Sequence, residues 1–191
     1  MKGKYTLLVY LANIMLIISL AYTPIFNTLY VHPHEYGHVF FKEMMGGENC
    51  TFIIFDEKTE VFLCGDQLCN RPPDRAGCAF CLDGPNTTNY YLYGGLGGMI
   101  ANTGVATAFS IFPPTALFGS AMFIINTISF PTAYQYDIEG IVYSSTIPTE
   151  LGLSMIFAFF LLNVCMIFVS YRIWNWFIKF IEHRLSTNHV A

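Results

Sequence analysis

The chain has 191 residues, of which 54% are hydrophobic and only 12% are charged. Soluble globular domains carry about 25% charged residues, so this composition argues against a soluble protein and favours one that lies in a membrane. The formal net charge is −4, and no basic patch with interleaved aromatic residues is present, which argues against a nucleic-acid partner.

Two long stretches contain no Asp, Glu, Lys or Arg, one from Tyr5 to His34 and one from Gly84 to Tyr136. An ionised side chain in the centre of a bilayer costs about 2.5–3.5 kcal/mol even on the mildest scale. Stretches of this length without charge therefore suit a hydrocarbon environment. We expect an integral, multi-pass membrane protein.

Four hydrophobic segments approach the roughly 20 residues that a membrane helix needs: Tyr5–Val31, Tyr90–Phe112, Thr115–Phe130 and Leu151–Tyr171. The first is either one long tilted helix or two shorter helices that break near Thr23-Pro24, the second continuing through the histidines. Pro33 suits the first turn of a helix and Gly46-Gly47 its end, which predicts a helix over Pro33–Met45. Phe112-Pro113-Pro114 predicts a tight turn.

Basic residues near both ends, Lys2 and Lys4 and then Lys179 and Arg184, place both termini in the cytoplasm. The segment 46–89 holds seven acidic residues against three basic ones, so we expect it outside. The predicted fold is an all-α integral membrane protein with about four to five transmembrane helices. It forms a single domain over residues 1–191, with a Cys-rich extramembrane loop at 46–89 inserted after the histidine-bearing helix.

The run His34-Glu35-Tyr36-Gly37-His38 has the pattern HExxH. Residues four apart share one face of a helix, so both imidazoles can bind the same zinc ion. Glu35 is then placed to take a proton from a zinc-bound water. The pattern predicts a catalytic zinc site.

A catalytic zinc commonly takes three protein ligands, so a third must come from elsewhere. Asp137 is the first charged residue after Asp83 and directly follows an apolar segment. We therefore prefer Asp137 as the third ligand. Asp83 is the main alternative, and Glu139 and Glu150 are weaker ones. His32 is expected to be an interfacial histidine rather than a ligand.

Three features of the chain resemble the site-2 protease family of intramembrane zinc metallopeptidases. The run from His34 to Val39 resembles the family's HExGH helix, and Gly94–Asn102 is similar to its small-residue segment that ends in Asn. Asn126, Pro131 and Asp137 with Gly140 resemble its later Asn…Pro…Asp-Gly element, although Ile138 and Glu139 separate the Asp from the Gly here. The literal string Leu82-Asp83-Gly84 comes before the glycine segment, which is the wrong order for the family.

The resemblance implies that zinc binds His34, His38 and Asp137, and that Glu35 accepts a proton and then protonates the leaving amine. It also implies that Asn102 lies near the site, where it contacts substrate or the oxyanion. Independently of the family, Gly94 and Gly98 form a pair of small residues four apart, which lets two helices approach closely.

The loop 46–89 contains five cysteines: Cys50, Cys64, Cys69, Cys78 and Cys81. They could hold a structural zinc or form disulfides in an oxidising compartment. The acidic composition and the sequons at Asn49 and Asn86 favour the external, disulfide interpretation. Because the loop connects the histidine helix to the glycine segment, we expect it to cap the site and limit substrate access.

These observations predict a membrane-embedded zinc metalloendopeptidase that hydrolyses peptide bonds of membrane-associated proteins, with the bilayer and a membrane protein or peptide as its partners. One alternative is another membrane zinc peptidase that uses a Glu as third ligand. A second is a non-catalytic adaptor or pseudoprotease with a structural zinc. The presence of Glu35 argues against the second, because a structural zinc needs no base beside it.

Overall fold

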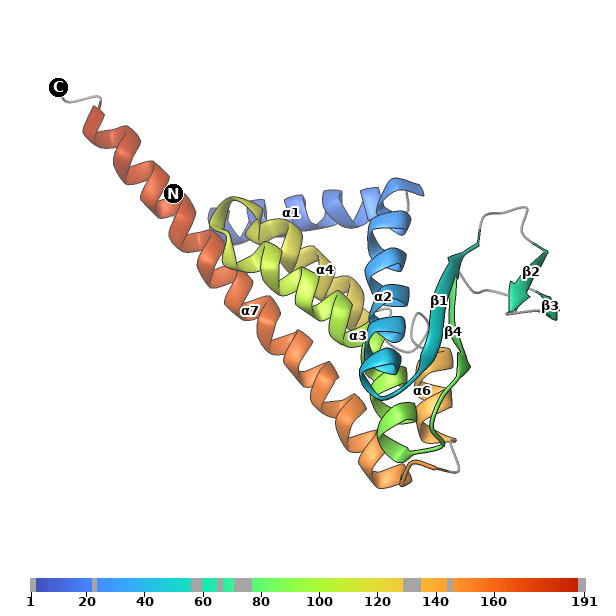
Figure 1. The fold of residues 1–191 in the computed structure, drawn as a ribbon. Helices are drawn as coiled ribbons and strands as arrows, with labels where there is room; N and C mark the ends of the chain where they lie inside the picture. The colour runs from blue at the N-terminus through green and yellow to red at the C-terminus, as the bar shows by residue number, and fades with distance from the viewer. Residues whose placement is uncertain are drawn as a thin grey trace.

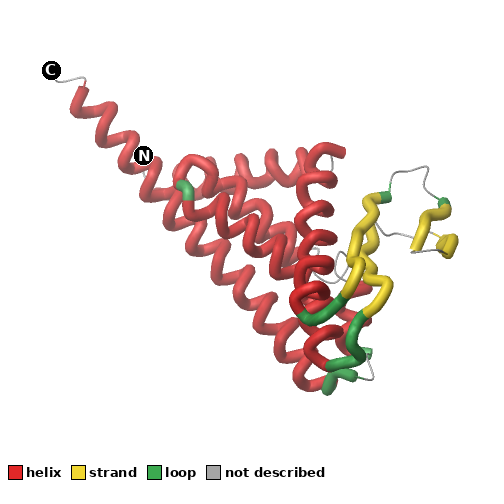
Figure 2. The backbone as a smooth tube through the Cα atoms, viewed as in Figure 1, coloured by secondary structure: helices red, strands yellow, loops and turns green. Residues whose placement is uncertain are grey.

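The computed structural model describes residues 3–21, 24–55, 60–64, 67–70, 77–128, 135–143 and 146–188. Helices make up most of the described chain, and a strand pair lies along one side of them (Figures 1 and 2). The helices are α1 (Gly3–Ala21), α2 (Pro24–Met44), α3 (Thr88–Ile111), α4 (Ala116–Ile128), α6 (Gln135–Val142) and α7 (Thr149–Asn188), with a short 3-10 turn η1 (Pro113–Thr115) between α3 and α4.

The first apolar segment forms two helices, and α2 continues through the histidines. The expected alternative with a break near Thr23-Pro24 is therefore confirmed, whereas the expected helix start at Pro33 is wrong, since Pro33 lies inside α2. Pro24, rather than Pro33, occupies the first turn of this helix, where proline is preferred. Pro33 removes one hydrogen bond from the helix without ending it. The helix ends at Met44, and Gly46 follows with a φ of +93°, a conformation that favours glycine.

The prediction of an all-α fold is wrong, because the segment after α2 forms strands. β1 (Glu48–Ile54) pairs antiparallel with β4 (Gly77–Asp83), and β2 (Val61–Cys64) pairs with β3 (Gln67–Asn70). β1 contains the run Thr-Phe-Ile-Ile, whose β-branched and aromatic residues favour strands. The β1–β4 pair runs beside α2, and β2–β3 lies farther out (Figure 1).

The expected four to five transmembrane helices are also wrong. Within the described residues, α7 is the one helix that is long and apolar enough to cross a membrane. A second candidate exists only if α3 and α4, which are bent by 118° at the predicted Pro113-Pro114 turn, count as one span. The long apolar run at the N-terminus is divided between two helices, which leaves α1 with an apolar part of only Leu7–Ser19, while charged side chains interrupt α2.

Buried apolar residues join the helices in three groups. One group joins α3, α6 and the start of α7, and its members are Leu92, Leu96, Met99, Ile141, Ile147 and Ile156. Ile141 is fully buried and contributes α6 to this group. This packing holds α6 against the first half of α3, which contains the glycine segment.

Candidate metal centre

Three side chains from two helices meet at one point. His34 and His38 come from α2, and Asp137 comes from α6. The two histidine Nε2 atoms lie 3.1 Å apart, and those of His34 and His38 lie 3.1 and 3.3 Å from the Asp137 carboxylate oxygens. Among the described residues, these three form the only group of His, Cys, Asp or Glu side chains spaced to hold a metal ion.

The spacing of these three ligand atoms fits a tetrahedral metal ion. Zinc bonds to nitrogen and oxygen are about 2.0–2.1 Å long, so two ligand atoms of a tetrahedral site lie roughly 3.3 Å apart. The observed separations of 3.1 to 3.3 Å agree with that value. Two imidazoles and one carboxylate are also a ligand set that catalytic zinc uses.

The His38 ring is held by the backbone of α3. Its Nδ1 atom lies 2.6 Å from the carbonyl oxygen of Gly94. A carbonyl oxygen only accepts hydrogen bonds, so Nδ1 carries the hydrogen and Nε2 faces the cluster. Such a partner on the far nitrogen is typical of metal-binding histidines, because it sets both the tautomer and the orientation of the ring.

Glycines let α3 approach α2 closely at the histidines, as we expected from the pair Gly94 and Gly98. A Cβ added at Gly98 would lie 2.4 Å from the His34 ring, and one added at Gly37 would lie 2.2 Å from the Gly97 carbonyl oxygen. Either side chain would collide with groups that cannot move freely. The close approach of these two helices therefore depends on the absence of side chains, and the His34 ring lies over Gly98.

Asp137 is positioned by the buried residue one turn later on the same helix. Ile141 packs against Gly95 of α3 and Gly152 of α7, where added Cβ atoms would lie 2.8 and 2.9 Å from it. Residues four apart share one helix face, so the same face of α6 presents Asp137 to the histidines. Packing at Ile141 thus brings a carboxylate distant in sequence to α2.

The charges of the cluster favour one another. Burial disfavours the charged form of Asp137, yet the imidazoles of His38 and His34 hold the pKa of this carboxyl well below its ordinary value. Burial also disfavours a charged His38, but Asp137 and the hydrogen bond to Gly94 raise the pKa of His38 above its ordinary value, and the charge of Glu35 acts in the same direction. The Asp137 carboxylate is therefore ionised, and its negative charge favours a positive charge at the point where the three side chains meet.

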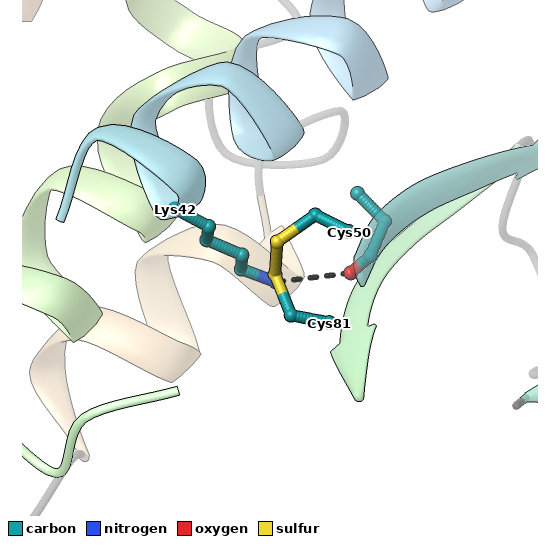
Figure 3. The surroundings of a disulfide bond; sticks show 4 residues. Lys42, Cys50 and Cys81 are labelled. Carbon is teal, nitrogen blue, oxygen red and sulfur yellow. Dashed lines mark hydrogen bonds between the residues drawn. A yellow bond between two sulfur atoms is a disulfide. The ribbon is translucent and has the colours of Figure 1, made fainter. Parts of the chain in front are cut away.

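Glu35 is buried, with 7% of its surface exposed, and lies beside the first residue of β4. A Cβ added at Gly77 would lie 2.7 Å from the Glu35 carboxylate oxygen. The strand pair is attached to α2 farther along, where Lys42 Nζ donates a hydrogen bond of 3.0 Å to the Ala79 carbonyl (Figure 3). The start of β4 consequently covers the carboxylate of Glu35.

A disulfide joins Cys50 of β1 to Cys81 of β4, next to Lys42 (Figure 3). The disulfide cross-links the two strands close to the C-terminal end of α2. Gly47 lies there between the Lys42 carbonyl and the two sulfur atoms. The expected disulfide chemistry of the loop is therefore present at this pair. The side chains of Cys64 and Cys69 lie outside the described residues.

The alternative third ligands do not join the histidines. Asp83 is exposed at the end of β4, opposite Glu48, and Glu139 and Glu150 are exposed on α6 and in the first turn of α7. His32 is also exposed, and its ring lies edge-on to Phe52 of β1. The structure thus brings Asp137, and none of these side chains, to His34 and His38.

Two asparagines expected from the resemblance lie in the interior of the helices. Asn102 is fully buried on α3 and follows Gly98 by four residues, so it lies one turn from the His34 contact on the same face. Asn126 is 1% exposed and forms hydrogen bonds to neighbouring helices. Gly140 is exposed on α6, and Pro131 lies outside the described residues.

Sequence reasoning missed the roles of the Gly94 carbonyl, of Gly77 and of Asn163, which accepts the hydrogen bond of Asn126. A backbone carbonyl has no sequence signal, and Gly77 stands in a segment where its strand was not expected. Asn163, however, is a polar residue inside the apolar segment Leu151–Tyr171, and buried polar residues in such segments are costly. That signal was sufficient to identify it.

A scan against protein-family models, a search of curated proteins and a search of solved structures each found no match. The site is therefore interpreted from its own geometry.

Proposed function

We propose that the chain is a zinc-dependent membrane endopeptidase of the site-2 protease type. The observation that supports this most directly is the spacing of 3.1 to 3.3 Å among His34 Nε2, His38 Nε2 and the Asp137 carboxylate. In the neutral tautomers that bind a metal, both imidazoles would turn an Nε2 lone pair toward the point where the carboxylate oxygens also lie, and a cation there would satisfy all three groups. Zinc matches both the ligand types and the spacing.

Zinc held by these residues supplies a Lewis acid that lowers the pKa of water toward about 7. Glu35 accepts a proton from the water that attacks the peptide carbonyl and then donates it to the leaving amine. Its burial next to the histidines favours this role, because a low dielectric strengthens its charge interactions. The hydrogen bond from the His38 ring Nδ1 to the Gly94 carbonyl oxygen keeps the ring oriented during the reaction.

The substrates in this proposal are membrane-associated proteins or peptides, because the site lies beside helices that suit a bilayer. Only 17% of the apolar window of α7 is buried within the protein, whereas the core helix of a soluble protein is mostly covered. Its exposed apolar side chains include Leu153, Phe157, Leu161, Leu162, Phe168 and Val169. We propose that α7 crosses the bilayer and that the bent α3–α4 pair forms a second membrane segment, which makes the protein multi-pass.

A structural zinc site in a non-catalytic protein is the second candidate. The observation that favours it is the burial of Glu35 beneath Gly77, since a substrate must displace the start of β4 to reach this carboxylate. The two functions differ in what Glu35 does. A structural site binds zinc and has no use for a base.

The deciding experiment compares the wild-type chain with Glu35→Gln, purified in detergent. Zinc content is measured by mass spectrometry, and cleavage is measured on a model transmembrane substrate. The proposal predicts that both proteins bind one zinc and that only the wild type cleaves. Equal cleavage by Glu35→Gln would rule out the mechanism, and zinc without cleavage in the wild type would favour the structural candidate.

A further inference from the structure

A chain of buried polar side chains connects four helices near the metal centre. The Tyr30 hydroxyl of α2 donates a hydrogen bond of 2.5 Å to Asn126 Oδ1 of α4. Asn126 Nδ2 donates one of 3.1 Å to Asn163 Oδ1 of α7. The Thr103 hydroxyl of α3 lies 3.3 Å from Asn163 Nδ2 and 3.4 Å from its Oδ1. We call Tyr30, Thr103, Asn126 and Asn163 the polar clasp.

The polar clasp lies on the histidine helix α2 and on the helices packed around the metal centre. Tyr30 precedes His34 by one turn on the same face of α2, and Thr103 follows Gly98, which contacts the His34 ring. Thr103 and Asn163 lie on α3 and α7, the two helices against which Ile141 of α6 packs. The clasp thus joins the helix that carries the histidines to the two helices that hold α6 and its Asp137.

Burying these polar side chains contributes little to the stability of the protein. Asn126 and Asn163 are 1% and 2% exposed and Thr103 is 7% exposed. A buried amide contributes little net stability even when all its hydrogen bonds form, and apolar residues of similar shape often stabilise as well or better. A directional polar contact does, however, specify one arrangement of helices, as a buried Asn does in coiled coils.

We propose that the polar clasp is a positioning device that sets α2 relative to α3 and α7, the helices that hold α6, so that Asp137 meets His34 and His38 at ligand spacing. Asn163 is its central positioning residue, because it contacts both Asn126 and Thr103. Its Nδ2 also donates to the Phe159 carbonyl one turn earlier, which fixes the orientation of the amide. The inference that the clasp controls metal affinity rests on the proposed function, whereas its effect on helix placement does not.

The test uses Asn163→Leu, which keeps the side-chain size and removes the hydrogen bonds, and Tyr30→Phe, which removes one hydroxyl and spares the fold. The matched control is Ser170→Ala. Ser170 of α7 is also fully buried and bonds across to Ser110 of α3 at 2.7 Å, but Ser110 lies roughly 18 Å along α3 from Gly98. All four full-length proteins are purified in detergent, and their melting temperatures are recorded.

Two measurements follow on each protein. Pulsed electron paramagnetic resonance measures the distance between spin labels on unnatural amino acids at Met44 and Tyr143, without added metal. Both positions are exposed; Met44 ends α2, and Tyr143 directly follows α6. Competition titration with Zn²⁺ then measures the metal affinity. Loss of a group that orients metal ligands typically weakens binding by about 10–100-fold, and we expect that for Asn163→Leu, a smaller loss for Tyr30→Phe and wild-type affinity for Ser170→Ala.

The distance distribution should broaden in Asn163→Leu and Tyr30→Phe and stay as in the wild type in Ser170→Ala. Distance distributions that remain narrow in both clasp variants would overturn the inference. So would a Zn²⁺ affinity of Asn163→Leu equal to that of Ser170→Ala. If the wild type binds no Zn²⁺, the proposed function fails, while broadened distances would still support the clasp. A loss of melting temperature alone, with both other measurements unchanged, would reduce these residues to a structural role.

Discussion

The two sides of α2 differ in how they are packed, and the proposed metal ligands and the proposed base divide between them. Toward α3, backbone meets backbone: an added Cβ at Gly37 would lie 2.2 Å from the Gly97 carbonyl, and His38 bonds to the Gly94 carbonyl. Toward the strand pair, the contacts are fewer, with Gly77 against Glu35 and Lys42 bonded to Ala79. The first side leaves little room for displacement at the glycines, whereas the second is held through side chains, which we expect to separate more readily.

This difference suits the proposed function, in which the site holds a metal ion and still admits a substrate. Ligand atoms must remain within a few tenths of an ångström of their positions, which the glycine contacts with α3 ensure for His34 and His38. A base needs access to the reacting atoms, and Glu35 faces the side that can open. We therefore expect changes on the α3 side to affect zinc and folding, and changes on the strand side to affect turnover.

The largest expected effect is on cleavage in Glu35→Gln. Loss of a general base typically lowers the rate by about 10²–10⁴-fold, and the isosteric amide keeps the contact with Gly77. Zinc content and melting temperature should match those of the wild type. Loss of zinc in Glu35→Gln would show that Glu35 supports metal binding, as the residues on the α3 side of α2 do.

Asp137→Ala should lose zinc, because it removes the only carboxylate among the described residues that joins the two histidines. We expect an affinity loss above the roughly 10–100-fold that follows from removing a supporting residue. Asp83→Ala is the matched control, since Asp83 is exposed at the end of β4. If Asp137→Ala kept its zinc and Asp83→Ala lost it, the third ligand would be Asp83 on the strand side.

Gly37→Ala should destabilise the protein by about 1–3 kcal/mol, the usual cost of forcing extra atoms into a packed interior. The new Cβ would meet the Gly97 carbonyl at 2.2 Å and the Ala101 Cβ at 2.6 Å. Gly104→Ala on α3 is the control, because nothing lies within 4 Å of its added Cβ, and it should stabilise by about 0.5–1 kcal/mol. Denaturation in mixed detergent micelles measures both, and equal stabilities would show that the α3 side yields easily.

The smallest effect is expected from the double variant Cys50→Ser, Cys81→Ser. The disulfide joins β1 to β4, so without it the start of β4 should leave Glu35 more readily, and cleavage should rise several-fold with zinc content unchanged. Cys165→Ser, an exposed cysteine of α7, is the control for the chemistry of the substitution. A double variant that loses zinc would make the strand pair part of the metal site rather than its cover.

Local patterns predicted the parts of the site that depend on a single helix. His34 and His38 share a face because helical geometry repeats within one turn, and Gly46 ends α2 because its positive φ suits glycine. The glycine pair Gly94 and Gly98 was also recognised, since small residues four apart allow close helix contact. The preference for Asp137 over Asp83 followed from position in the chain, and the structure brings Asp137 to the histidines.

The sequence by itself determined the apolar composition, the two histidines on one helix face and the candidate carboxylate. It did not determine how the apolar runs divide into helices, because a charge-free stretch is equally compatible with one long span, two short helices or a bent pair. Only the tertiary structure decided that strands cover Glu35 and that Asn163 joins the helices around the centre. These features depend on contacts between residues far apart in the chain, which no local pattern encodes.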